Sequence, residues 1–348
     1  MTGPWYVFYS CVGVNFVTTL FTMLAIQVKD YGNADQLYLA PFPTPAPEPW
    51  EIRVQVHATA LNRADILQRE GHYPPPEGAS PILGLEIAGV VEAVGSEVTR
   101  WEIGDAVFGL LPGGGYAEYA VMHEDMAMPL PEGWEFTKAA AVPEVFLTAF
   151  QALRWVGNLR KDETVLLHAG ASGVGTAAIQ LAKKMGATVL VTASSGKHAL
   201  CLDLGADHAI DYRKGPFLEK VEELTEGKGV NLIVDPVGGD YFDQNIKVLQ
   251  RDGRLVMLAV MAGGKTSASI GPIVFKRLQI LGTTLRSRTP DYQIRLTREF
   301  VAFAYDDLVS QAICPVVDEV YHWHDVAKAH RYMEANLSAG KVILQIKE

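Results

Sequence analysis

The sequence predicts an α/β protein of two domains, one made of short β-strands and the other built on a doubly wound parallel sheet. The chain has 348 residues, of which 49% are apolar, and a single hydrophobic core rarely grows to that size. Short strands bounded by glycine and proline dominate its first third. Further along, strands and helices alternate, which is typical of parallel strands joined by crossover helices.

The first domain is predicted from short apolar runs. In the run EIRVQVHA, Glu51–Ala58, every second residue is apolar, as expected of a strand with one buried face. A proline tract at 41–49 separates this run from an earlier one, and proline ends a strand because it cannot donate a ladder hydrogen bond. The other strands expected in this domain are 23–28, 87–94 and 105–111.

The second domain is predicted from alternating strand and helix patterns that begin after a helical segment near Lys138. The expected strands are 164–168, 188–192, 232–235 and 254–259. The expected helices are 176–185, 197–204 and one near Gln244. A tail with an amphipathic helix at 325–336 and a strand at 341–346 resumes the style of the first domain.

These patterns divide the chain into four segments. They are an N-terminal appendage at 1–22, the first domain at 23–146, the parallel-sheet domain at 147–288 and a return to the first domain at 289–348. The appendage carries no charge and could cross a bilayer by length. It contains Pro4, Gly13 and Asn15 but no basic segment of the kind that begins a signal peptide, so we expect no membrane span.

Charge and cysteine content exclude several classes of partner. The formal net charge of −10 disfavours binding to the phosphates of nucleic acids. The three cysteines, Cys11, Cys201 and Cys314, are far apart and form no CxxC pair. That usage favours a reducing compartment, and we expect a cytoplasmic protein.

The cluster AGASGVG follows the strand expected at 164–168 and opens the next helix. Glycines at such a turn let the backbone approach a pyrophosphate, and the helix N-terminus offers free N–H groups and a positive dipole end. An ordinary tight turn is the alternative, but the strand before and the helix after favour a dinucleotide-binding loop. The candidate cofactor-binding residues in it are Gly170, Ser172, Gly173, Val174 and Gly175.

The segment after the second strand of the parallel sheet bears on which dinucleotide is bound. NAD-binding sites place an acid there to accept hydrogen bonds from the ribose 2′-OH. Here Ser194, Ser195 and Lys197 follow the strand, with no acid among them. Hydroxyls and an ammonium suit a 2′-phosphate, so we expect NADPH. The alternative is a helix N-cap beside a solvated lysine.

From Met23 onward the chain resembles the quinone oxidoreductase branch of the medium-chain dehydrogenase/reductase superfamily. The resemblance implies a GroES-like β domain, a Rossmann domain that binds NADPH, and a homodimer. The stretches that carry it are LNRADILQREGHYPPPEGASPILGLEIAG at 61–89, LLPGGGYAEY at 110–119, AAAVPEVFLTAF at 139–150 and VLLHAGASGVGTAAIQLAK at 165–183.

The resemblance also predicts that the protein has no catalytic zinc. Zinc-dependent members of the superfamily carry a cysteine where this chain has Asn62 and a histidine where it has Leu85. Leucine cannot bind zinc and asparagine is a poor ligand. His322 and His324 have a spacing compatible with a metal, but no third ligand is near in the sequence, and we interpret them as part of a surface turn. We therefore expect no metal site.

Further site residues are implied by the resemblance. Asn62, Thr148 and Ser172 match contacts on the nicotinamide side, and Tyr73 matches an active-site tyrosine. Asn62, Tyr73 and Ser172 are thus the candidate catalytic residues, although Tyr73 could only pack on the substrate and Asn62 could only cap a helix. Contacts to the 2′-phosphate match Ser195, Lys197 and Tyr212, with Ser194 as a neighbour. Ala259 stands where relatives have glycine near the nicotinamide.

Three functions are compatible with these features. The expected one is hydride transfer from NADPH to a quinone, in which the cofactor supplies the chemistry and the protein supplies position and a hydrogen-bond donor. Reduction of an α,β-unsaturated carbonyl, an enone or a 2-alkenal, needs the same groups. A protein that binds NADPH without catalysing any reaction is the third.

Overall fold

The computed structural model describes residues 21–347, so residues 1–20 of the predicted appendage lie outside the described part of the chain. The chain divides into two compact units. The first, here called the β unit, comprises residues 21–143, 319–337 and 342–347. The second, the α/β unit, comprises residues 144–318 and 338–341. The fold class predicted from the sequence, a GroES-like sheet domain with a Rossmann-type parallel sheet, is confirmed.

The α/β unit contains a six-stranded sheet in the order β10-β9-β8-β11-β12-β13. All its pairings are parallel. The strands are β8 (Thr164–Leu167), β9 (Thr188–Ala193), β10 (His208–Asp211), β11 (Val230–Asp235), β12 (Leu249–Met257) and β13 (Gln279–Gly282). The chain winds outward from β8 in one direction and then from β11 in the other, so the strand order reverses between these two strands. Ligands of such sheets bind at the carboxyl ends of the strands, at this reversal.

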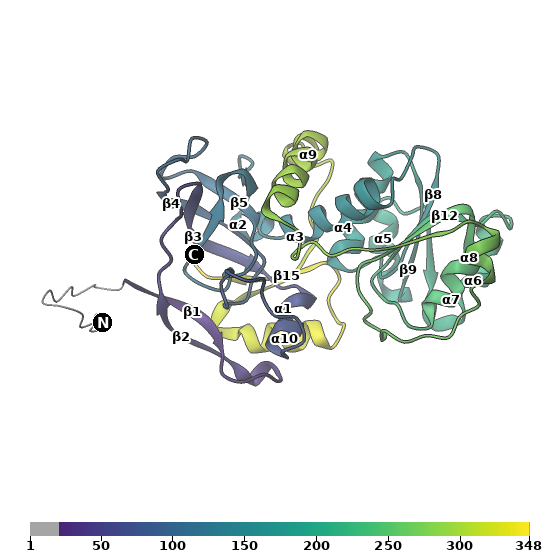
Figure 1. The fold of residues 1–348 in the computed structure, drawn as a ribbon, viewed down its shortest axis with the longest axis horizontal. Helices are drawn as coiled ribbons and strands as arrows, with labels where there is room; N and C mark the ends of the chain where they lie inside the picture. Colours follow the sequence, from purple (N-terminus) through teal and green to yellow (C-terminus); the bar gives the residue numbers. More distant parts are fainter. Residues whose placement is uncertain (1–20, 348) are drawn as a thin grey trace, which may run out of the picture. The chain divides into compact units, whose positions relative to one another are not determined.

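Helices cover both faces of the parallel sheet (Figure 1). The helices of this unit are α3 (Pro143–Phe150), α4 (Gly173–Lys184), α5 (His198–Asp203), α6 (Phe217–Leu224), α7 (Tyr241–Val248), α8 (Gly271–Phe275) and α9 (Pro290–Val309). Figure 1 shows α6, α7 and α8 on one side of the sheet and α4 and α5 on the other. One core lies under α6 and α7, where Phe217, Val221 and Ile246 pack on the strands.

The β unit is built on antiparallel strands. Its two-stranded sheet pairs β1 (Thr22–Val28) with β2 (Leu37–Pro43). The larger sheet has the order β14-β15-β3-β4-β5-β7, and β6 pairs with β3. Its strands are β3 (Glu51–Ala60), β4 (Glu86–Val94), β5 (Ala106–Leu110), β6 (Tyr119–His123), β7 (Ala127–Pro129), β14 (Val317–His322) and β15 (Lys341–Gln345). Along β3, Ile52, Val54 and Val56 are buried, as the alternation in the sequence predicts.

Three helices belong to the β unit: α1 (Arg63–Arg69), α2 (Phe136–Ala139) and α10 (Val326–Glu334). Helix α10 buries Val326, Ala329 and Met333 in the core of the unit. No helix of residues 21–347 is long and apolar enough to cross a membrane.

The structure differs from the sequence prediction in several respects, and β10, β13 and α6 are among the elements that were not predicted. Helix α4 begins at Gly173 and not at Thr176, because Ser172 caps it. Helix α9, twenty residues long, was not predicted. The return to the β unit was also placed too early, at 289: residues up to 318 belong to the α/β unit. The reason is that α9 packs on the α/β unit: its Phe300 contacts Phe146 and Phe150 of α3 and is completely buried.

Candidate cofactor-binding and active site

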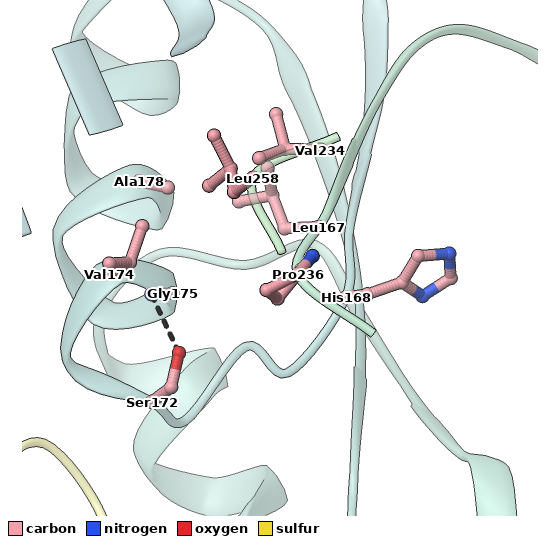
Figure 2. Close-up of a pocket in the computed structure, with 9 residues that line it drawn as sticks. All are labelled: Leu167, His168, Ser172, Val174, Gly175, Ala178, Val234, Pro236 and Leu258. Atoms are coloured by element: carbon pink, nitrogen blue, oxygen red, sulfur yellow. Dashed lines mark hydrogen bonds between the residues drawn. The ribbon is translucent and has the colours of Figure 1, made fainter. Parts of the chain in front are cut away.

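A short loop joins the end of β8 to the start of α4 and carries the predicted glycine cluster. Ser172 is the N-cap of α4, and its hydroxyl oxygen accepts a hydrogen bond from the Gly175 backbone N–H at 3.1 Å (Figure 2). Ala169, at the start of the loop, has a φ of 53°, which a residue with a Cβ adopts only at a cost. The loop therefore turns sharply and presents the N-terminus of a twelve-residue helix at the carboxyl edge of the sheet.

The two central glycines are required to different degrees. A Cβ on Gly175 would lie 2.4 Å from the Ala169 carbonyl oxygen and 2.5 Å from that of Gly170. A Cβ on Gly173 would meet only side chains, with the Cδ of Lys341 at 2.8 Å and a methyl of Val145 at 3.0 Å. Backbone cannot give way as the end of a lysine can, so Gly175 is the position that excludes every side chain.

A small cavity of about 10 Å³ lies beside this loop. Figure 2 shows Val174 and Ala178 of α4 directed toward Leu167, Val234 and Leu258. A larger hollow of about 560 Å³ begins at the same Leu258 and extends along the carboxyl ends of β12 and β13. Its lining comprises Met257, Leu258, Ala259, Val260, Gly282, Thr283, Thr284, Ser287 and Arg288. Two separate spaces, which share Leu258 as a lining residue, thus lie at the carboxyl edge of the sheet.

Thr148, predicted from the resemblance, lies half-buried in α3. Val145, one turn before it, is the residue whose methyl lies against Gly173. Residues three apart share a helix face, so α3 turns Thr148 toward the glycine loop. The structure thus places Gly170, Ser172, Gly173, Val174 and Gly175 in one loop, with Thr148 one helical turn after the α3 residue that lies against that loop.

The other predicted cofactor-binding residues follow the outer strands. Ser195 and Lys197 form a 3₁₀ turn directly after β9, with Ser194 as its N-cap. Tyr212 begins a similar turn directly after β10 and is exposed. The Lys197 ammonium donates a hydrogen bond to the Ser338 carbonyl oxygen at 2.5 Å. These residues lie at the same edge of the sheet as the glycine loop, because parallel strands end together.

A buried polar network that the sequence did not reveal lies under the loop. His168, the residue after β8, contacts the Thr192 hydroxyl through Nδ1 at 2.9 Å and the Asn245 Oδ1 through Nε2 at 2.7 Å. Asn245 in turn donates its amide hydrogen to Asp235 Oδ2 at 2.8 Å. The other oxygen of Asp235 accepts the backbone N–H groups of Val237 and Gly238. The network therefore ties the loop after β8 to the loop after β11.

The hydrogen bonds assign the protonation of His168. Because the Asn245 amide nitrogen donates to Asp235, its oxygen must accept from Nε2, which leaves Nδ1 to accept from Thr192. That is a neutral imidazole, and burial indeed lowers the pKa of His168 despite the opposing charge of Asp235. His168 is among the residues that line the cavity, but Figure 2 shows its ring directed away from the other lining side chains, so its hydrogen bonds hold the loop in place.

In the β unit, two buried carboxylates hold Asn62, the N-cap of α1. The Asn62 side-chain amide donates to Glu86 Oε1 at 2.8 Å, and its backbone N–H donates to Asp65 Oδ2 at 2.7 Å. The second Asp65 oxygen accepts the Gly84 N–H at 3.0 Å. Asp65 and Glu86 are 1% and 0% exposed. Asp65 consequently holds the backbone of Asn62, and Glu86 orients its side-chain amide.

A second buried network continues from Asp65. Arg69 Nη1 lies 3.1 Å from His330 Nδ1, and arginine can only donate, so Nδ1 accepts and Nε2 carries the hydrogen. Nε2 then donates to the Tyr116 hydroxyl at 3.3 Å, and that hydroxyl donates to Asp65 at 3.4 Å. Burial and the charge of Arg69 lower the pKa of His330 to about 3. Burial and Asp65 raise the pKa of Tyr116.

These side chains do not suit a zinc ion. Leu85 offers no ligand atom, and the Asn62 amide nitrogen presents a hydrogen to Glu86, where a metal would need a lone pair. Within the described part of the chain, no three His, Cys, Asp or Glu residues are grouped as a metal site requires. His322 and His324 stack face to face at 4.6 Å in the turn after β14, as expected of a surface turn.

Tyr73, the remaining candidate, lies in the loop after α1. Its backbone N–H donates to the Leu67 carbonyl oxygen at 3.2 Å, and the residue is partly exposed. The loop is thus fastened to α1, the helix that Asn62 caps. Asn62 and Tyr73 are both presented by this one helix and its ends.

A GroES-like sheet domain and a parallel sheet with a glycine loop together define an oxidoreductase of the medium-chain dehydrogenase/reductase type. The family profile described as alcohol dehydrogenase GroES-like domain matches residues 48–132, and that described as zinc-binding dehydrogenase matches residues 173–301. The quinone oxidoreductase of Pseudomonas aeruginosa is 35% identical over 325 residues, covering 92% of this chain and 98% of the relative. The chain belongs to the quinone oxidoreductase branch of this superfamily, as the sequence predicted.

Solved structures support the same family assignment. The quinone oxidoreductase of Escherichia coli complexed with NADPH matches with a TM-score of 0.84 and 30% identity, covering 93% of this chain and 100% of that one. The enoyl reductase CurK matches with a TM-score of 0.83 and 27% identity, over 93% and 99% of the two chains.

Polyketide synthases are also related to this chain. A phenolphthiocerol synthesis polyketide synthase of Mycobacterium bovis is 42% identical over 229 residues, which cover 65% of this chain. Those residues make up 11% of the synthase. The chain therefore corresponds to a small part of that much larger protein.

Proposed function

We propose that this protein is an NADPH-dependent quinone reductase that transfers hydride to a quinone without zinc. The observation that carries the proposal is the glycine loop, where Ser172 caps α4 and Gly175 leaves no room for a Cβ. Loops of this geometry hold a dinucleotide pyrophosphate at a helix N-terminus. The similarity to quinone oxidoreductases supports a quinone as the acceptor of the hydride.

The proposed cofactor lies along the carboxyl edge of the parallel sheet. Gly170, Gly173, Val174 and Gly175 would hold its pyrophosphate, and Ser194, Ser195, Lys197 and Tyr212, which follow β9 and β10, would hold the 2′-phosphate of its adenosine half. Its nicotinamide half runs the other way, into the 560 Å³ hollow that contains Ala259. Two arms that diverge at the strand reversal fit the shape of a dinucleotide.

The cofactor, when bound, supplies the hydride. Ser172 and Thr148 hold and orient it on the α/β unit. Of the candidates in the β unit, Asn62 is the proposed contact of the nicotinamide, and the Tyr73 phenol is the proposed hydrogen-bond donor to the acceptor carbonyl. The Asn62 amide already donates to Glu86 and to the Ala60 carbonyl oxygen, so its orientation is set before the cofactor binds.

Reduction of an α,β-unsaturated carbonyl is a second candidate, favoured by the similarity to an enoyl reductase structure. It uses the same hydride and the same donors. The experiment that separates the two follows NADPH oxidation with a quinone and a 2-alkenal side by side, in the presence of EDTA. We expect faster turnover of the quinone, undiminished by EDTA, because Asn62 and Leu85 cannot hold zinc.

Each other outcome of this assay has its own meaning. Faster turnover of the alkenal would replace the quinone by the enone as the substrate class. Tight NADPH binding without turnover of either acceptor would identify a non-catalytic NADPH-binding protein. Activity that EDTA abolishes and zinc restores would overturn the zinc-free mechanism.

The proposal includes a homodimer that works in the cytoplasm. Strand β13 is the edge of the parallel sheet, and the segments around it expose apolar side chains: Val260, Met261, Ile270, Val274, Phe275 and Ile280. An exposed apolar edge is a place where a second copy pairs. We expect a dimer in analytical ultracentrifugation, and Ile280→Lys should shift it toward monomer.

Cys201 and Cys314 are free thiols, as suits a reducing compartment.

A further inference from the structure

The carboxyl ends of β9 and β10 meet at one point of the sheet edge. Their parallel register pairs Asp211 with Ala193, so the turn after β10 lies beside the turn after β9. Both turns are short 3₁₀ segments, Ser195–Lys197 and Tyr212–Lys214. The ribose 2′ position of the proposed NADPH falls here, because the end of the second strand of such a sheet binds that ribose.

Lys197 is a poor choice as the main phosphate ligand of this site. Its ammonium is hydrogen-bonded to the Ser338 carbonyl oxygen at 2.5 Å and lies under the influence of the Asp318 carboxylate. Partial burial lowers its pKa, Asp318 opposes that shift, and the charge of Arg213 adds to it. The lysine therefore fastens the turn to residue 338, and part of its charge is already balanced.

The site also contains an acid, contributed by the third strand. Asp211 accepts the backbone N–H of Arg213 at 3.0 Å, and this bond together with one from the Ser195 hydroxyl lowers the pKa of Asp211. Its carboxylate is thus charged and lies beside Ser195. A carboxylate at this point accepts from a ribose 2′-OH and repels a 2′-phosphate, so binding of NADPH needs a strong compensating cation.

Arg213 has the properties of that cation. It follows Asp211 by two residues, is exposed, and its guanidinium lies 5.8 Å from the centre of the Tyr212 ring. Arg213 is near enough to Lys197 to influence that side chain electrostatically. It forms no ion pair within residues 21–347. The planar guanidinium binds phosphate through two parallel N–H groups, which an ammonium cannot do.

We propose that Arg213 is the residue that selects NADPH over NADH, by binding the 2′-phosphate against the charge of Asp211. The inference rests on the proposed function, since it concerns the same cofactor. Asp211 is the opposing determinant: it favours the free 2′-OH of NADH. The cofactor preference is the balance of these two side chains on one turn.

The test is a fluorescence titration of the full chain with NADPH and with NADH, in wild type, Arg213→Ala, Arg213→Lys and Lys214→Ala. Lys214 is the matched control, an exposed cation on the same turn. Arg213→Ala should raise the NADPH dissociation constant at least about tenfold, about 1.4 kcal/mol, and change that of NADH less than about twofold. The NADPH dissociation constant of Arg213→Lys should lie between those of wild type and Arg213→Ala, and that of Lys214→Ala should equal the wild-type value.

Asp211→Asn tests the opposing side. It keeps an acceptor for the Arg213 N–H and removes the charge, so NADH should bind more weakly and NADPH at least as well. Equal NADPH affinities of Arg213→Ala and Lys214→Ala, in chains with wild-type melting temperatures, would overturn the inference while the proposed function stands. A wild-type chain that binds neither nucleotide would overturn both.

Discussion

Replacing Gly175 with valine should abolish NADPH binding, raising the dissociation constant by more than about a hundredfold, which corresponds to roughly 2.7 kcal/mol. The reason is geometric. A Cβ at this position would lie 2.4 and 2.5 Å from two backbone carbonyl oxygens of the loop. The loop would have to move, and with it the N–H groups at the start of α4 that meet the pyrophosphate.

Two other glycines provide the controls. Gly264→Val introduces the same side chain where only a Val260 methyl lies within 4 Å, at 3.9 Å, so affinity should stay at the wild-type level. Gly173→Val should weaken binding less than Gly175→Val, because the side chain of Lys341 can yield. Titration with NADPH and thermal unfolding of all three variants measure this. Wild-type affinity in a folded Gly175→Val chain would show that the loop is an ordinary turn.

Acid should destabilise the β unit by about 1.4 kcal/mol per pH unit through His330 alone. This imidazole is fully buried with a pKa of about 3, whereas an unfolded histidine titrates near pH 6.5. Between these values the unfolded chain binds a proton that the folded chain does not. Stability is therefore complete above about pH 6.5 and is lost as the pH falls toward about 3.

The measurement is the urea midpoint of unfolding across pH 4 to 7, compared between wild type, His330→Asn and His72→Asn. Asparagine at 330 keeps an acceptor for Arg69 and removes the titration, so the dependence on pH should become shallower by about one proton, even if the variant is less stable throughout. His72 is exposed in the same unit, and its replacement should leave the slope unchanged. Identical slopes in all three chains would contradict the assignment of a neutral His330.

Much of the fold was predictable because its signals are local. The alternation along Glu51–Ala60 and the glycine cluster before α4 each lie within a dozen residues, and local periodicity specifies strand, turn and helix. Helix α9 was missed although it is the longest helix of the described residues. Residues 289–318, which include α9, were consequently assigned to the wrong unit.

The candidate site also contains residues that local sequence could predict and residues that it could not. The residues that form the glycine loop are neighbours in the chain, so the sequence alone could predict Gly170, Ser172, Gly173, Val174 and Gly175 as a cofactor loop. The absence of a zinc ligand at Leu85 came from the family resemblance, which identifies the position, together with the chemistry of leucine, which offers no ligand atom.

Only the tertiary structure decided which side chains support these residues. Asn62 and Glu86 are 24 residues apart, His168 and Asn245 are 77 apart, and Arg69 and His330 are 261 apart. Asp211 reaches Ser195 through the register of two parallel strands. Pairing across such distances depends on how strands and helices pack, and no local pattern encodes it. The sequence by itself therefore determined the fold class and predicted the cofactor loop, whereas the packing decided the protonation of the buried histidines and the charges around the proposed 2′-phosphate site.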